Sequence, residues 1–381
     1  MKIVHLSDLH LGKLVNGINM LDDQKYIFER ILDALKSERP DALIIAGDVY
    51  DRSIPSAEAV TFFDEFLNKV TDLEKSPKMF IISGNHDSSE RLAFGNRLIA
   101  KTGVHLSPVF DGNITPIVMK DEFGEVAFYM LPFIKPADAR NAYPDEKIET
   151  YTDALKAAIG HLQRDDSRRN VLIAHQFVTG AERSESEDVV IGGLDNVDAS
   201  VFCGFDYVAL GHLHRPQAVP GNENIRYCGT PLKYSISEEN DQKSILIVEM
   251  AEKGTVNYRT IPLIPLHDIR TIRGKYNELA SRENYIGTNT DDYIHVVLTD
   301  EEDVIDAMGR LRTIYPNIMK LDYDNKRTSH GGKIEGIENI DKKSDMEILE
   351  ELYKLQNNQP ISDEQRSFAE KLFNDIQEGR A

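Results

Sequence analysis

Residues 1–13 read MKIVHLSDLHLGK, and the pattern in this stretch recurs along the chain. Residues 2–6 form a short, half-apolar run of the kind that makes a β-strand. The run stops at Ser7 and is followed at once by Asp8 and His10. A carboxylate and an imidazole are both metal-ligating side chains, so their position predicts that the end of this strand has a chemical role.

Four later apolar runs end in the same way: DALIIAGD (41–48), KMFIISGNHD (78–87), RNVLIAHQ (169–176) and FDYVALGHLH (205–214). In open α/β sheets, ligands gather at the carboxyl ends of the strands. We therefore expect the polar residues at these five ends to converge, although they are far apart in sequence. They are Asp8, His10, Asp48, Asp51, Asn85, His86, Asp87, His175, His212 and His214.

Each of these residues also has an ordinary structural explanation. A single Asp or Asn after a strand is usually a turn former or a helix cap, and a single histidine usually lies on the surface or in a satisfied core. The number and the placement favour ligation, because five of the eleven histidines stand at such strand ends. The other six have no such context and are expected to be structural or exposed: His5, His105, His161, His267, His295 and His330.

Oxygen and imidazole ligands without a thiolate suit manganese, iron, zinc or magnesium, and the many nitrogen ligands make magnesium and calcium less suitable. Two cations about 3.5 to 4 Å apart need a bridging carboxylate, and together they can hold a phosphate and activate water. Asp48 is the natural candidate for the bridge. The sequence thus predicts a pair of divalent cations at one edge of a sheet.

The spacing of apolar residues predicts helices over 22–40, 56–70 and 151–163 and a β-hairpin over 113–132, with further strands at 225–230 and 243–250. Helices that alternate with apolar strands indicate an α/β core with some antiparallel sheet. A strand, a helix over 301–316 and another strand follow. We divide the chain into a main domain (1–265), a small α+β domain (266–326), a polar linker (327–343) and a C-terminal helical segment (344–381). Ser344 with Glu347 and Ser362 with Gln365 are capping-box patterns that open two helices in this last segment.

Composition excludes several classes of protein. The 381 residues contain two cysteines without CxxC spacing, which argues against a disulfide framework and against a cysteine metal site. The start of the chain lacks the features of a signal peptide, and no apolar run approaches the roughly 18 residues that span a bilayer, so we expect a cytoplasmic protein. The formal net charge of −20 argues against a chain that coats DNA by itself.

The motifs DLH, GDVYD, GNHD, AHQ and GHLH, in this order, resemble the five signature blocks of the calcineurin-like metallophosphoesterases. Within that superfamily, HLSDLHLGK, AGDVYDRSIPS, SGNHDS, VALGHLHRPQ and YCGTPLKYS resemble the SbcD family of nucleases. This family is the bacterial counterpart of the eukaryotic double-strand-break repair nuclease. The resemblance is strong over about residues 1–240 and implies a two-sheet sandwich flanked by helices, with a small capping domain and C-terminal helices.

The resemblance also implies ligand sets. One metal is held by Asp8, His10, Asp48 and His214, and the other by Asp48, Asn85, His175 and His212. His86 is not a ligand in this scheme: it faces the scissile phosphate, and Asp87 orients its imidazole. The Asp51 position carries histidine in some members of the family, so the resemblance assigns no fixed role to Asp51.

The resemblance further implies manganese as the metal, DNA as the substrate, a coiled-coil ATPase of the SbcC type as partner, and a homodimer within a heterotetramer. The candidate dimer helices lie in SSERLAFGNRLIA (88–100), where ordinary helix packing is an alternative account. The candidate DNA contacts adjoin the metal motifs, although solvated surface charge also explains each of them: Lys13, Arg52, Arg91, Arg215 and Lys233. The candidate partner contacts form two apolar stripes, which could instead pack on the chain's own core: Leu349, Leu352, Tyr353, Phe368, Leu372, Phe373 and Ile376.

Two competing functions remain. A phosphomonoesterase or cyclic-nucleotide phosphodiesterase of the same superfamily would need the same metals. Serine/threonine phosphatases of the superfamily usually have arginine before the GNH block and glycine after DR, where this chain has Ser83 and Ser53. The second alternative is a non-catalytic scaffold, which would tend to lose ligands, whereas this chain has them all.

Overall fold

The computed structural model describes residues 1–187, 195–326, 328, 344–357 and 359–377. Within these ranges, the side chains of Arg97, Asp345, Leu355, Gln356 and 374–377 are outside the description. The chain divides into two units, Met1–Ile269 and Arg270–Ala381. None of the described helices is long and apolar enough to cross a membrane.

Unit 1 contains two six-stranded sheets. The first has the order β14-β13-β1-β4-β5-β6, in which β1, β4, β5 and β6 are parallel and β13 and β14 are antiparallel to their neighbours. Its strands are β1 (Lys2–Leu6), β4 (Ala42–Ala46), β5 (Lys78–Ile82), β6 (Val104–Ser107), β13 (Ser244–Met250) and β14 (Val256–Pro262). A separate two-stranded ribbon, β2 (Leu14–Val15) and β3 (Ile18–Asn19), follows the first strand.

The second sheet has the order β11-β12-β10-β9-β8-β7, with β8, β9, β10 and β12 parallel. β7 and β8 form the hairpin that the sequence predicts. The strands are β7 (Ile117–Asp121), β8 (Gly124–Met130), β9 (Arg169–His175), β10 (Tyr207–Gly211), β11 (Gln217–Val219) and β12 (Asn222–Tyr227).

The two sheets pack face to face. One buried cluster takes Ile44 and Phe80 from the first sheet and Phe128 and Ile173 from the second. Phe80 and Phe128 stack with their ring centroids 4.3 Å apart. Since alternate residues of a strand face opposite sides, every second apolar residue enters this shared core. The two-sheet sandwich is therefore confirmed.

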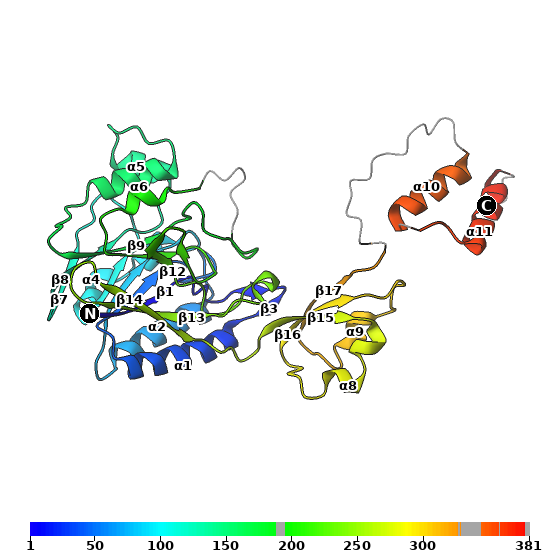
Figure 1. The fold of residues 1–381 in the computed structure, drawn as a ribbon, viewed down its shortest axis with the longest axis horizontal. Helices are drawn as coiled ribbons and strands as arrows, with labels where there is room; N and C mark the ends of the chain where they lie inside the picture. Colours follow the sequence, from blue (N-terminus) through cyan, green and yellow to red (C-terminus); the bar gives the residue numbers. More distant parts are fainter. Residues whose placement is uncertain (188–194, 327, 329–343, 358, 378–381) are drawn as a thin grey trace. The chain divides into compact units, whose positions relative to one another are not determined.

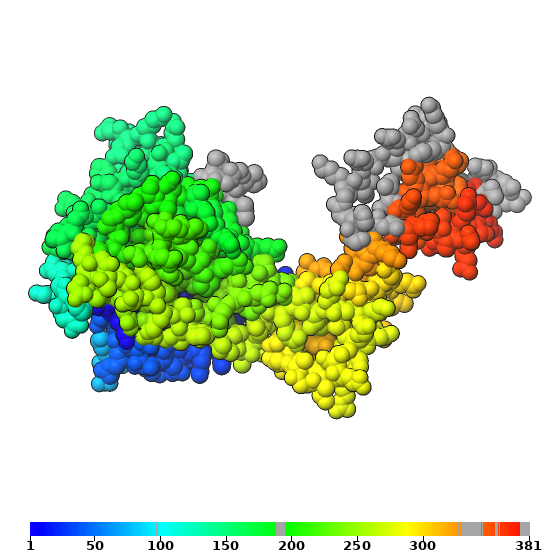
Figure 2. Space-filling view, in the orientation of Figure 1, coloured from blue at the N-terminus to red at the C-terminus, as the bar shows by residue number. Residues whose placement is uncertain are grey.

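Helices cover the outer faces of the sandwich, and side chains fill the space between the ribbons (Figures 1 and 2). α1 (Leu21–Glu38) packs on α2 (Ala57–Thr71) through Phe28 and Phe66. α5 (Pro136–Ala142) and α6 (Tyr151–Gly160) contribute Ala139 and Leu155 to the core beside the second sheet. The helices predicted over 22–40, 56–70 and 151–163 are confirmed, with ends shifted by a few residues.

The segment 88–100 does not form one long helix. It contains two single turns, α3 (Ser89–Leu92) and α4 (Asn96–Ile99), separated at Gly95, whose backbone is left-handed with a φ of 75°. Phe94 and Leu98 are 88% and 73% exposed. The candidate dimer segment is thus helical in two short turns, and dimerisation through it stays a prediction.

Unit 2 contains a three-stranded sheet of order β15-β16-β17, in which β16 and β17 are parallel. Its elements are β15 (Ile269–Gly274), α7 (Tyr276–Leu279), α8 (Arg282–Tyr285), β16 (Tyr293–Leu298), α9 (Ala307–Leu311) and β17 (Ile318–Tyr323). Ile294, Val296 and Leu311 lie in its core. The helix expected over 301–316 is wrong in its length, because the left-handed backbone of Asp306, with a φ of 50°, precludes helix before Ala307.

Two helices end the described chain, α10 (Asp345–Asn357) and α11 (Asp363–Gln377). Their capping boxes are confirmed. Ser344 Oγ accepts a hydrogen bond from the Glu347 N–H at 3.3 Å while the Glu347 carboxylate accepts from the Ser344 N–H at 2.8 Å. Ser362 and Gln365 repeat this exchange. Apart from residue 328, the linker expected at 327–343 lies outside the described residues, and the domain boundaries expected from sequence stay predictions.

Candidate metal centre

The five strand ends meet at one edge of the sandwich. β1, β4 and β5 deliver Asp8, Asp48 and Asn85 from the first sheet, and β9 and β10 deliver His175 and His212 from the second. Three groups of side chains have ligand atoms within 4.8 Å of one another: Asp8, His10 and His214; His10, Asp48 and His86; and Asp8, Asp48 and His175. The expected convergence is therefore confirmed as geometry, while ligation itself stays a prediction.

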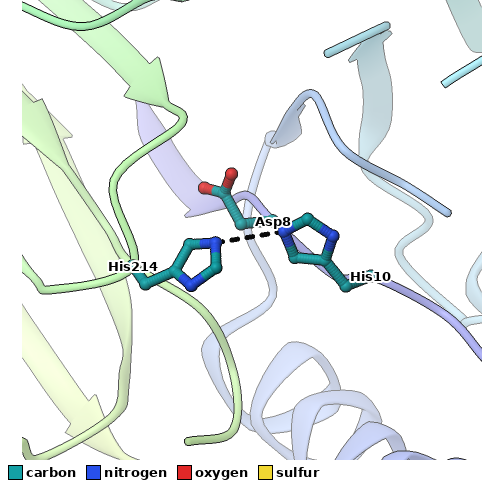
Figure 3. Close-up of side chains that lie close together, drawn as sticks. All are labelled: Asp8, His10 and His214. Atoms are coloured by element: carbon teal, nitrogen blue, oxygen red, sulfur yellow. Dashed lines mark hydrogen bonds between the residues drawn. The ribbon is translucent and has the colours of Figure 1, made fainter. Parts of the chain in front are cut away.

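The first group faces a common point. Figure 3 shows the rings of His10 and His214 turned toward each other beside Asp8, with the two Nε2 atoms 3.1 Å apart. All three residues are buried. Each neutral imidazole has one nitrogen that lacks a proton, so two such nitrogens directed at one point suit a cation.

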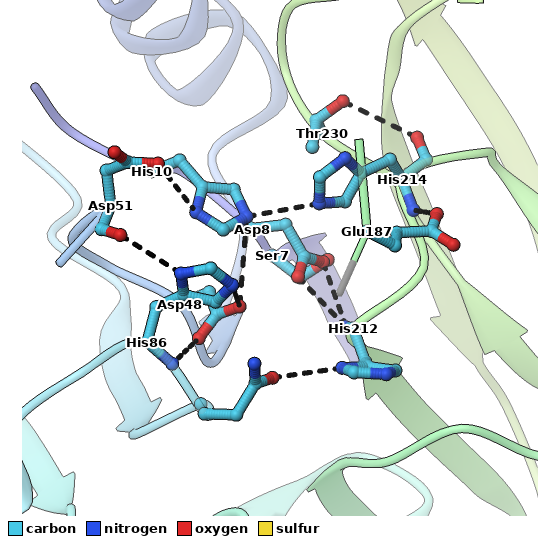
Figure 4. Close-up of polar contacts among 12 residues, drawn as sticks. Ser7, Asp8, His10, Asp48, Asp51, His86, Glu187, His212, His214 and Thr230 are labelled. Carbon is cyan, nitrogen blue, oxygen red and sulfur yellow. Dashed lines mark hydrogen bonds and ion pairs between the residues drawn. The ribbon is translucent and has the colours of Figure 1, made fainter. Parts of the chain in front are cut away.

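Asp48 lies between His10 and His86 on one side and His175 on the other, and Figure 4 shows its contacts with His10 and His86. Its Oδ2 atom is 3.3 Å from His175 Nε2 and 3.7 Å from His10 Nε2. Its Oδ1 atom accepts a hydrogen bond from the backbone N–H of His86 at 2.9 Å. One carboxylate oxygen thus approaches ligand candidates from both sheets, which is the geometry that a bridging ligand requires.

A further set of candidate ligands surrounds Asn85. Its Oδ1 atom is 3.1 Å from His175 Nε2 and 3.0 Å from His212 Nδ1. His175 is held from behind, because its Nδ1–H donates to the Ala46 carbonyl at 2.8 Å. That bond directs Nε2 toward Asp48 and Asn85, so candidate donor atoms of Asp48, Asn85, His175 and His212 converge from four strand ends.

His86 and Asp87 differ from each other in what they contact. The ring of His86 lies at the edge of the site, where Nδ1 is 3.0 Å from the Asp51 carbonyl oxygen and Nε2 is 3.9 Å from Asp48 Oδ2. The carboxylate of Asp87 instead accepts hydrogen bonds from the backbone N–H groups of Val49, Tyr50 and Gly84 at 2.9 to 3.1 Å. Asp87 therefore ties the loops after β4 and β5 together, and its expected role in orienting the His86 imidazole stays a prediction.

Four of the candidate ligands have a left-handed backbone. Their φ angles are 52° at Asp8, 44° at His10, 50° at Asp48 and 104° at His212. A residue with a Cβ adopts this region at a cost of order 1–3 kcal/mol, and such residues cluster at functional sites. The surrounding structure must stabilise these backbone conformations. The sharp turns that they make direct the four side chains toward the same site.

The charges of the site balance only with a cation or a bound proton. Burial would raise the pKa of Asp48, but His175 and His10 hold it well below its usual range. Burial would likewise lower the pKa of His175, but Asp48 and Asp8 raise it to about 9. Burial lowers the pKa of His212 to about 3, so this ring is neutral and able to ligate. The donor set therefore fits a divalent cation, which would replace the proton on His175.

Sequence patterns missed the residues that hold the loop after β1. The amide Nε2 of Gln24 donates to the carbonyl of His10 at 2.8 Å, and Oε1 of Gln24 accepts from the Gly12 N–H at 3.0 Å. The hydroxyl of Tyr234 donates to the Leu9 carbonyl at 2.7 Å and contacts Gln24 Nε2 at 2.9 Å. Gln24 and Asp23 are the buried polar residues of α1, and the partners of Gln24 lie outside this helix, so sequence patterns did not reveal them.

The five candidate DNA contacts fall into two kinds. Lys13, Arg215 and Lys233 form close ion pairs, with Asp51 at 2.8 Å, with Glu182 at 2.7 Å and Asp241 at 2.9 Å, and with Asp268 at 2.8 Å. Arg91 is exposed, and Arg52 is 68% exposed and 3.5 Å from Asp51. Arg52 and Arg91 therefore have the better access to a polyanion.

The candidate partner contacts lie on the last two helices, which Arg366 and Glu350 join by an ion pair at 3.2 Å. Phe368 is 71% exposed and Leu372 is 46% exposed. Leu352 is exposed as well, while Leu349, Tyr353 and Phe373 are half-buried. The side chain of Ile376 lies outside the described residues.

Comparison with known proteins identifies two families. The calcineurin-like phosphoesterase model matches residues 1–216, and a model described as the type 5 capsule protein repressor C-terminal domain matches residues 265–357. The chain is 35% identical to the SbcD subunit of the SbcCD nuclease from Staphylococcus epidermidis over 379 residues, covering 99% of each protein. It is 34% identical to the protein of the same name from Staphylococcus saprophyticus, covering 98% of each. Among solved structures, a dimetal phosphatase from Danio rerio is 13% identical, covers 69% of this chain and 99% of its own and has a TM-score of 0.41, a likeness too distant to support an argument.

Proposed function

The chain belongs to the calcineurin-like phosphoesterases and, within them, to the SbcD nuclease subunits, and from this premise we propose that it is a two-metal-dependent DNA nuclease. The observation that carries the proposal is the position of Asp48 Oδ2, which approaches His175 at 3.3 Å and His10 at 3.7 Å. Asp8, His10, Asp48 and His214 would hold the first metal. Asp48, Asn85, His175 and His212 would hold the second.

When bound, the two cations would neutralise phosphate charge and would lower the pKa of a water molecule toward neutrality. His86 protonates the leaving oxygen or stabilises the charge on the phosphate. Its ring is oriented by the Asp51 carbonyl at Nδ1, and its side chain is 21% exposed, against 3% for Asp48. Asp87 fixes the backbone on which both Asp48 and His86 depend.

The proposal includes the finer points that follow from family membership. The metal is manganese, and the substrates are duplex DNA ends, hairpins and single strands in DNA repair and recombination. The partner is an SbcC-type coiled-coil ATPase in the cytoplasm, with two copies of this chain in a heterotetramer. We assign DNA gripping to residues 266–326 and partner docking to residues 344–381.

Phosphomonoester hydrolysis is the competing activity, and one contact speaks against it. Ser83, which precedes the GNH block, is 1% exposed, and its hydroxyl donates to the Pro108 carbonyl at 2.7 Å. No cationic side chain therefore stands at this position to hold a terminal phosphate.

The test compares His86→Gln with Asp48→Ala in the full chain. His86→Gln should keep two manganese ions and lose about 10²- to 10⁴-fold in cleavage of linear duplex DNA, the usual contribution of a general acid. Asp48→Ala should lose both the ions and the cleavage, because it removes the shared ligand. The measurements are metal content by mass spectrometry and product release with an SbcC-type partner and ATP.

Either of two results would defeat the proposal. One is brisk hydrolysis of phosphoserine peptides by wild-type protein that leaves duplex DNA intact in the presence of manganese and the partner. The other is cleavage by His86→Gln at the wild-type rate.

A further inference from the structure

His214 is held at each polar atom of its backbone by a different side chain or loop. Its N–H donates to Glu187 Oε1 at 2.7 Å. Its carbonyl accepts from Lys243 Nζ at 2.7 Å and from the Thr230 N–H at 3.1 Å. Figure 4 shows Glu187 and Thr230 on either side of the residue. These hydrogen bonds fix the backbone of His214. The imidazole can still exist in two tautomers, with the proton on Nδ1 or on Nε2.

A hydrogen-bonded relay of Ser186 and Glu238 on the Nδ1 side of the ring selects the tautomer. Ser186 Oγ lies 2.5 Å from His214 Nδ1 and donates its proton to Glu238 Oε1. A hydroxyl has one proton to give, so an oxygen that donates to a carboxylate must accept from the ring. Nδ1 consequently carries the proton, and the lone pair of Nε2 points toward His10 and Asp8 (Figure 3).

Glu238 is held as an acceptor. It is 0% exposed, and its Oε2 atom pairs with Lys243 Nζ at 2.6 Å. Lys243 is itself buried, and the same Nζ donates to the His214 carbonyl. A buried carboxylate with a buried ammonium partner keeps its charge, since breaking such a pair is strongly unfavourable. Glu238 therefore accepts the Ser186 proton, and Ser186 in turn accepts the proton of His214 Nδ1.

His10 has no equivalent support among the described residues. Its Nδ1 atom is buried without a hydrogen-bond partner and lies 3.7 Å from Asp51 Oδ1. The ring pair that faces the first metal position therefore has one constrained member, His214.

We propose that Ser186 and Glu238 are positioning residues for His214, which fix its tautomer so that Nε2 serves as a metal ligand. The inference rests on the two-metal function proposed above. Hydrogen-bonding partners of ligating histidines typically contribute 10- to 100-fold to metal affinity. The relay acts on the first metal position, because the second has no His214 ligand.

The competing explanation is that Ser186 only anchors the segment 184–187 to the segment that contains Glu238. Ser237 offers a matched control. Its Oγ atom accepts from the Glu185 N–H at 3.2 Å, so it holds the same segment, but it has no contact with His214. If anchoring is the whole role, then Ser186→Ala and Ser237→Ala should have the same effect.

The experiment titrates the full-length chain with Mn²⁺ by calorimetry and records the visible absorption of the Co²⁺-loaded protein. Wild type should bind two ions. Ser186→Ala should bind one of them about 10- to 100-fold more weakly and alter the Co²⁺ spectrum. Ser186→Thr, which keeps the hydroxyl, should restore both, and Ser237→Ala should match wild type in both readouts.

Glu238→Gln is the second variant, and it decides the question if Ser186→Ala does not fold. Its amide can donate to Ser186, which then turns its own proton toward Nδ1 and favours the wrong tautomer for ligation. The inference would be overturned if Ser186→Ala had the Mn²⁺ affinity and the Co²⁺ spectrum of wild type. If Ser186→Ala does not fold, the same result in Glu238→Gln would overturn it. A wild-type chain that binds no pair of ions would instead defeat the proposed function.

Discussion

Gly84 has no side chain at a place where the candidate bridging ligand already fills the space. A Cβ atom on Gly84 would lie 2.1 Å from Asp48 Oδ1 and 2.5 Å from the Asp48 backbone nitrogen. Gly47 has the same relation to His175, since a Cβ there would lie 2.3 Å from Nδ1. The glycines in AGD and SGN are thus required by neighbouring ligands and not only by the turns that contain them.

Gly84→Ala should displace Asp48 and abolish high-affinity binding of manganese. The reason is steric, because no real Cβ contact is as short as the one that alanine would create here. Metal stoichiometry by mass spectrometry checks this. Gly160→Ala is the control, since Gly160 ends α6 with nothing within 4 Å of its Cβ position. Two bound ions at wild-type affinity in Gly84→Ala would contradict the steric argument.

At the scale of residues, sequence predicted what depends on local context. An apolar strand followed by a polar end is a local signal, and it identified Asp8, Asp48 and His175 as residues that meet. The backbone contacts of Asp87 could not be predicted, because its partners Val49 and Tyr50 lie on another loop, 38 and 37 residues away. Ser186 and Glu238 gave no signal at all, since their contacts depend on the folded arrangement of loops.

At the scale of elements, helices were predicted well where one face packs on a sheet. The apolar spacing of α1 is read from Ile27, Ile31 and Leu35, which are all buried. α9 is the exception. Val304, Met308 and Leu311 have helical spacing, but α9 begins at Ala307, and Val304 packs on the core of unit 2 from the segment before the helix. Periodicity alone does not distinguish a helix from an irregular segment that buries the same side chains.

Glu38, the last residue of α1, joins that helix to two strands of the first sheet. Its carboxylate accepts from the two terminal guanidinium nitrogens of Arg259 on β14, from Nη1 at 2.9 Å, and from Lys2 Nζ on β1 at 3.0 Å. The hydrogen bond with Arg259, with help from Lys2, lowers the pKa of Glu38 to about 2 from its usual 4.5. A lowered carboxyl pKa stabilises the folded state above the unfolded value, and this contribution is lost as pH falls through the folded value.

Glu38→Gln should therefore unfold at a lower temperature than wild type at neutral pH. The difference should shrink as pH falls from about 4.5 to about 2, where the wild-type carboxylate takes up its proton. Thermal unfolding followed by circular dichroism across this range measures it. Glu249→Gln removes a half-exposed carboxylate 3.5 Å from the same Arg259 and should have little effect. A constant difference at every pH would show that the carboxylate is not the cause.

At the scale of the whole molecule, a net charge of −20 opposes the binding of DNA. Affinity for a polyanion must come from the cations at the metal centre and from local basic side chains. Of the five candidates, Lys13, Arg215 and Lys233 are occupied by acidic partners, which sequence could not reveal because those partners lie on other loops. Arg52 and Arg91 are exposed, and both lie within a few residues of candidate ligands in the sequence.

Replacing both arginines with alanine should weaken duplex binding uniformly across sequences. It should also make the plot of log affinity against log salt concentration shallower by about 2, because each lost phosphate contact removes about 0.9 from the slope. Fluorescence anisotropy of labelled duplex DNA, with full-length protein, manganese and the partner, provides the measurement. Lys36→Ala, in the last turn of α1 and 58% exposed, removes an equally accessible charge away from the strand ends and should leave the slope unchanged. An unchanged slope in the double variant would mean that DNA reaches the metal centre by another route, and equal losses in both proteins would mean that only overall charge matters.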